Sequence, residues 1–76
     1  MIILSEEKLR QVKSNYPVGC RVVLREMHDF QAPPVGTAGT VYGVDDTGSL
    51  LVHWDTGGSL GVIYGVDKVE KIQEND

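Results

Sequence analysis

The sequence predicts a mainly β domain: a small, strongly bent, five-stranded barrel preceded by one short α-helix. From residue 19 onward, apolar and polar residues alternate with a period of two, which is typical of strands with one buried face. Tight-turn sequences rich in Asp and Gly separate the later alternating runs. Nine glycines in 76 residues can supply the bulges and corners that a small barrel requires.

Length and composition limit the chain to one globular domain. Its 76 residues are 41% hydrophobic and 24% charged, as in an ordinary folded unit. No apolar run approaches the ~20 residues of a membrane-spanning helix, and residues 1–4 are too short for a signal peptide. The single cysteine, Cys20, cannot form an internal disulfide, so we expect a cytoplasmic protein without membrane contact. The chain divides into a helical arm (1–15), a barrel (16–72) and a polar tail (73–76).

A helix is predicted in the N-terminal arm. Ser5 is a good N-cap because its hydroxyl can accept from a backbone N–H of the first turn. Glu6 and Glu7 follow, where the helix dipole favours negative charge. Pro17 disfavours helical geometry in Tyr16, so the helix ends by that residue. About ten residues form a marginal helix alone, so we expect it to dock on the barrel through Leu9, Val12 and Tyr16.

Five strands are predicted, over residues 20–25, 39–44, 50–54, 59–64 and 69–72. In the second strand, Val41 and Val44 share a face only if a bulge separates them, and Gly43 is the expected position. Tyr42 then points away from the core. Trp54 continues the apolar face of the third strand, so we expect its indole in the core.

The connections between these strands differ in kind. Residues 27–36 show no periodicity and contain Pro33 and Pro34, which indicates a long, stiffened loop. Residues 45–48 and 55–58 have the composition of tight hairpin turns. In the second of these turns, the sequence favours Asp55 as a local acceptor for backbone N–H groups.

Seven short motifs run from Tyr16 to Ile72: Y-P-x-G-x-R-V, M-x-D, A-P-P-x-G, G-T-V, V-D-D-x-G, V-x-W-D and G-V-D. Together they resemble a small bacterial and phage family, domain-of-unknown-function family 4314. A looser likeness is to SH3-like barrels of the KOW and Mib/Herc2 kinds, which share the Gly-x-Val strand and the Val-x-Trp-Asp-x-Gly hairpin. The resemblance implies an SH3-like barrel. It implies no activity and assigns no functional residues.

The sequence favours a protein that is not an enzyme, with no metal or cofactor site. Cys20 shares the apolar face of the first strand, and His53 faces opposite Trp54, so no thiol–imidazole pair is indicated. His28 and Asp29 would provide only two metal ligands. Residues 45–48 lack the ordered oxygen ligands of a calcium loop.

Binding of a protein or peptide partner is the predicted function. The expected surface combines the long loop with neighbouring aromatics: Met27, His28, Phe30, Pro33, Pro34, Tyr42 and Tyr64. The alternative for Phe30 is that it tucks under its loop as a small core. Pairing at a sheet edge, including weak homodimerisation, is the second route to a partner.

Charge leaves two further hypotheses. A KOW-like nucleic-acid binder could use the cations Arg21, Arg25 and Lys68 or Lys71, although the net charge of −4 opposes it. An acidic mimic of nucleic acid, acting as an antirepressor, would need one face that gathers Asp45, Asp46, Asp55, Asp67 and Glu70. A scattered arrangement of these carboxylates leaves only a solubilising role.

Overall fold

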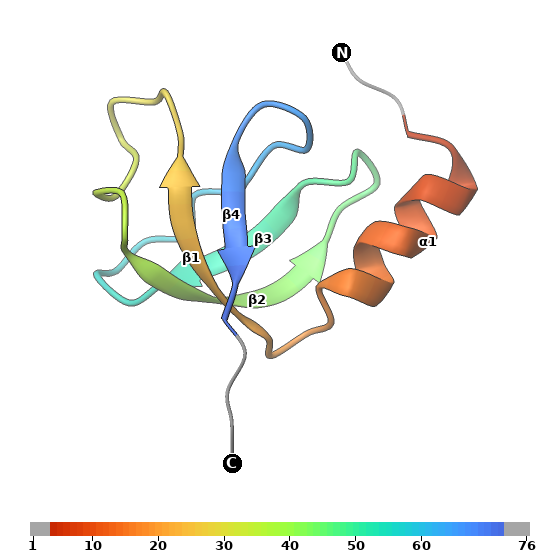
Figure 1. Cartoon of the computed structure of the whole chain (residues 1–76), viewed down its shortest axis with the longest axis horizontal. Helices are drawn as coiled ribbons and strands as arrows, with labels where there is room; N and C mark the ends of the chain where they lie inside the picture. Colours follow the sequence, from red (N-terminus) through yellow and green to blue (C-terminus); the bar gives the residue numbers. More distant parts are fainter. Residues whose placement is uncertain (1–3, 73–76) are drawn as a thin grey trace.

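The computed structural model describes residues 4–72 and is mainly β with one short helix, as predicted (Figure 1). Its elements are α1 (Glu6–Asn15), β1 (Arg21–Glu26), β2 (Ala38–Val44), β3 (Leu50–Trp54) and β4 (Lys68–Lys71). The strands form one antiparallel sheet in the order β3-β2-β1-β4. The predicted polar tail, residues 73–76, and the first three residues of the helical arm lie outside the described part.

Residues 59–64, predicted as the fourth of five strands, do not form a strand. They make one isolated bridge, in which Val62 and Leu50 exchange backbone hydrogen bonds of 2.9 Å. The backbone carbonyl of Leu60 is occupied elsewhere, since it accepts the indole N–H of Trp54. The described sheet therefore has four strands and is unclosed, and the five-stranded SH3-like barrel is not confirmed.

Helix α1 begins and ends where the sequence predicts. The Ser5 hydroxyl caps the helix by accepting from the Lys8 amide at 3.1 Å. At the other end, the Tyr16 amide donates to the carbonyl of Val12 at 3.0 Å. Val12 is buried and Tyr16 packs against the core, which confirms docking through this face. Leu9 is only partly buried, and Leu4 packs against the core instead.

The core lies on the concave face of the sheet. Its buried side chains are Val12, Val22, Leu24, Val41, Leu50, Val52, Trp54 and Val62. The register of β2 on β3 passes from Val41 opposite Val52 to Gly43 opposite Leu51, so the predicted bulge is present. Tyr42 is the extra residue and faces outward, as expected. Trp54 is 4% exposed, which confirms its place in the core.

Candidate functional site

The seven predicted contact residues occupy three separate regions. The first is the loop after β1, which carries the four candidates from residue 28 to residue 34. Met27, at the start of this loop, packs against the core instead of lying free. Tyr42 lies on the outer face of the sheet, and Tyr64 packs against the core near α1. Sequence proximity to a predicted loop did not distinguish these environments.

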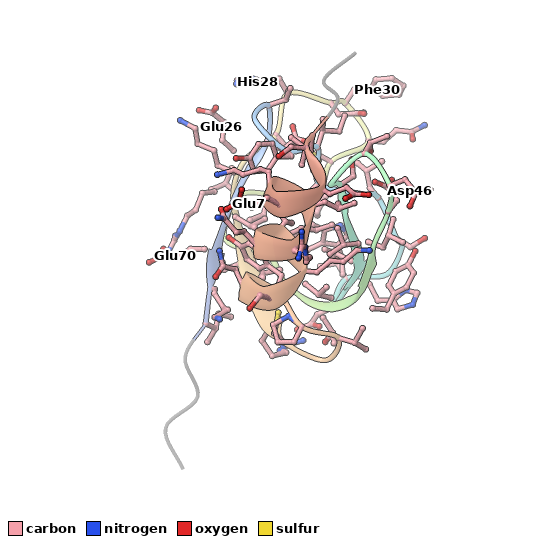
Figure 2. The ribbon with its side chains drawn as sticks, turned by 90° about the vertical axis from the view of Figure 1, so that its right-hand side faces the viewer. Glu7, Glu26, His28, Phe30, Asp46 and Glu70 are labelled. Carbon is pink, nitrogen blue, oxygen red and sulfur yellow. The ribbon has the colours of Figure 1, made fainter. Side chains whose placement is uncertain are left out.

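The first turn of the loop holds Phe30 in solvent. The Asp29 carboxylate accepts from the Gln31 amide at 2.8 Å, and the Asp29 carbonyl accepts from the Ala32 amide at 2.9 Å. These bonds fix the residue between them. Phe30 is 96% exposed, so the alternative in which it tucks under the loop is wrong. Figure 2 shows its ring directed away from the molecule.

A second turn in the same loop presents another apolar side chain. Thr37 closes it, because its amide and its hydroxyl both donate to the Pro34 carbonyl, at 3.0 Å and 2.6 Å. Val35 lies at the tip and is 65% exposed. Sequence reasoning missed Val35. The signal that could have found it is its place between a proline and a glycine, at the apex of a turn.

A cavity of about 330 Å³ opens between this loop and the segment after β3. Its lining is Gln31, Pro33, Trp54, Gly57, Gly58, Ser59 and Leu60. The indole N–H of Trp54 donates to the Leu60 carbonyl at 2.9 Å, so the polar atom of the ring is already satisfied. The cavity therefore offers a contacting ligand mainly the apolar surface of Pro33, Trp54 and Leu60.

The outer face of the sheet carries a polar and aromatic cluster. The rings of Tyr42 and His53 stack with their centroids 3.9 Å apart. Beside them, Arg21 donates to Asp55 at 2.7 Å and to the Thr40 hydroxyl at 3.0 Å. The hydrogen bonds from Arg21 hold the pKa of Asp55 below its ordinary value. Asp55 therefore ties strands together and does not cap its own turn, contrary to the sequence prediction.

The charges do not form a one-signed surface. Of the predicted cation wall, Arg21 is paired with Asp55, and Arg25 with Glu70 at 2.7 Å. Figure 2 shows Asp46 and Glu70 on opposite sides of the molecule. The proposed acidic residues are thus scattered, and two of them are neutralised by arginine. This arrangement disfavours both the nucleic-acid wall and the acidic mimic.

The groups weighed for catalysis lie apart. Cys20 packs against the core, while His53 stacks on Tyr42 at the outer face. Burial raises the pKa of the Cys20 thiol, which disfavours the reactive thiolate. Within residues 4–72, no three His, Cys, Asp or Glu side chains are grouped to hold a metal ion. Nor does this part of the chain contain a helix with the length and apolar character needed to cross a membrane.

Comparison with known proteins gives one match. A family model described as "Domain of unknown function (DUF4314)" matches residues 5–72. The match confirms the family resemblance and also includes α1, which precedes the sequence motifs. Neither the curated proteins nor the solved structures include a match to this chain.

Proposed function

The chain belongs to the DUF4314 family, and from that premise we propose that it is a small binding module for an apolar segment of a protein or peptide partner. The binding surface is the loop surface, defined as Phe30, Val35 and the cavity lined by Pro33, Trp54 and Leu60. The observation that carries the proposal is the 96% exposure of Phe30 on a turn held by hydrogen bonds.

An exposed aromatic ring on a fixed turn suits recognition for energetic reasons. Burying Phe30 against a partner removes a large apolar area from water, worth about 2 kcal/mol. The turn bonds at Asp29 already restrict the backbone, so little further ordering entropy is lost on binding. Val35 adds a second apolar contact from the neighbouring turn.

The cavity indicates what kind of segment fits. At about 330 Å³ it accommodates one or two side chains and not a folded domain. Pro33 and Leu60 offer it apolar walls, and the exposed turns provide contact on either side. We infer that the ligand is an extended segment with one apolar anchor residue, bound without covalent chemistry.

The test is a selection of random peptides on the immobilised chain, followed by calorimetric titration of the selected sequences. Phe30→Ser is expected to weaken binding of these peptides by at least about tenfold, because hot-spot side chains at interfaces each contribute more than about 1.4 kcal/mol. Val35→Ser is expected to weaken it less.

Val18→Ser is the matched control, because Val18 is equally apolar, is 75% exposed and precedes β1 at a distance from the loop in the sequence. It should leave affinity unchanged. Peptides that bind the Phe30→Ser variant as tightly as the wild type would refute the loop surface. A selection that enriches no peptide would count against the binding function itself.

A further inference from the structure

We propose that β4 is a homodimer surface, through which the open edge of this strand pairs antiparallel with β4 of a second copy. This surface is separate from the loop surface. β4 is the last strand of the sheet and pairs only with β1 among the described residues (Figure 1). A strand edge of this kind presents unpaired backbone groups that another strand can satisfy.

The register within the sheet identifies those groups. The Ile72 amide donates to the Arg21 carbonyl at 2.9 Å, so the backbone of Ile72 faces β1. Antiparallel strands alternate the direction of their N–H and C=O groups from one residue to the next. Glu70 therefore also faces β1, whereas Val69 and Lys71 direct their N–H and C=O groups to the open side.

The sequence of this edge is complementary to itself. Residues 67–71 read Asp-Lys-Val-Glu-Lys. In an antiparallel pair centred on Val69, Lys68 lies opposite the partner's Glu70, and Lys71 lies opposite the partner's Asp67. Opposite charges in directly facing positions stabilise strand pairs, and like charges destabilise them.

Other registers are disfavoured by the same charges. A shift of one residue in one direction places Lys68 opposite the partner's Lys71. The opposite shift places Asp67 opposite the partner's Glu70. Only the pairing centred on Val69 combines opposite charges with outward-facing backbone groups at its centre. A lysine-bearing edge usually resists association, but the alternating signs here remove that barrier for a second copy.

Val69 supplies the apolar centre of the interface. It is partly buried, packs against the core, and lines a cavity of about 490 Å³ together with Val12, Tyr16, Val62 and Tyr64. A two-fold axis perpendicular to the sheet brings the partner's Val69 to the same side, directly against it. The pair covers apolar surface that one copy leaves exposed.

The charged positions are available for this pairing. Glu70 lies at the rim of the molecule in Figure 2, and its side chain is 63% exposed despite its bond to Arg25. Lys68 is 4.0 Å from Glu26 and is also exposed. Exposed ion pairs of this kind contribute little to stability, so they do not hold the two side chains away from a partner.

The experiment is sedimentation equilibrium of the full chain at low salt, from about 10 μM to about 1 mM. The wild type is expected to dimerise reversibly. Lys68→Glu and Glu70→Lys should each raise the dimer Kd by at least about tenfold. The double variant K68E/E70K should return it to within about threefold of the wild type, because opposite charges face each other again.

Arg25→Ala is the matched control, since it removes the same internal ion pair as Glu70→Lys but leaves β4 unchanged. It should dimerise like the wild type, and thermal unfolding should verify that each variant is folded. A wild type that stays monomeric throughout the range would overturn the proposal. Single variants with wild-type affinity, or a double variant that does not recover, would overturn it as well.

Discussion

The two turns that flank β3 have related sequences but are built differently. In residues 45–48, the Asp45 carboxylate accepts from the amide and hydroxyl of Thr47, at 3.0 Å and 2.6 Å, and from the Ser49 amide at 2.9 Å. In residues 55–58, the Asp55 carboxylate leaves its own turn and binds Arg21. Aspartate at the start of a glycine-containing turn can therefore serve local or tertiary structure.

The difference follows from how each turn satisfies its backbone. In the second turn, the Trp54 amide donates to the Gly58 carbonyl at 3.1 Å, and the Gly57 amide donates to the Trp54 carbonyl at 2.9 Å. These bonds close the turn without a side chain, so Asp55 is available for Arg21 on β1. The lesson is that a turn closed by its own backbone bonds leaves its aspartate free to connect strands.

The largest expected effect tests the glycines of the two turns. Gly48 has φ 84°, and an added Cβ would lie within contact distance of Leu4, so Gly48→Ala should lower the free energy of unfolding by about 2–3 kcal/mol. Gly57 has φ 102° but open space around it, so Gly57→Ala should cost about 1–2 kcal/mol, from backbone strain alone. Urea denaturation measures both. Equal losses would show that packing on Leu4 does not distinguish the turns.

The aspartates should give the next largest effect. Asp45→Ala removes three hydrogen bonds from one turn and should lower the free energy of unfolding by about 1–2 kcal/mol. Asp55→Ala should cost less, because its ion pair with Arg21 is exposed. Raising the salt concentration should shrink the Asp55 effect and leave the Asp45 effect nearly unchanged. The opposite salt dependence would reverse the local and tertiary assignments.

The smallest effect concerns pH. The Thr47 hydroxyl is the main cause that lowers the pKa of Asp45, with desolvation opposing it. A lowered folded-state pKa contributes stability above the unfolded value of about 4, and this contribution is lost as the pH falls through the folded value. Acid unfolding of Asp45→Asn should therefore be less steep than that of the wild type. Thr47→Val should raise the pKa of Asp45 in a carboxyl titration by NMR; an unchanged pKa would contradict the stated cause.

Local patterns predicted most of the fold. The cap at Ser5, the alternation in β1 and β3, and the bulge beside Gly43 each depend on residues within a few positions of one another. The missing fifth strand depends on a different kind of contact. The bond from the Trp54 indole to the Leu60 carbonyl competes with strand pairing, and no period in the sequence encodes it.

The candidate site was less predictable for the same reason. An aromatic in a loop can lie inside or outside, and only the turn bonds at Asp29 place Phe30 in solvent. Met27 and Tyr64 pack against the core because of where the chain returns, not because of their neighbours in sequence. The cavity beside Pro33 joins segments more than 20 residues apart, so its lining could not be predicted before the fold was known.

The placement of Trp54 gives the chain an optical reporter of its own. It is the single tryptophan, it is 4% exposed, and it lines the cavity of the loop surface. Its emission should therefore be blue-shifted in the folded chain and move to longer wavelength on denaturation, without any attached dye. A ligand that enters the cavity should alter the same signal, so one spectrum can follow both folding and occupancy.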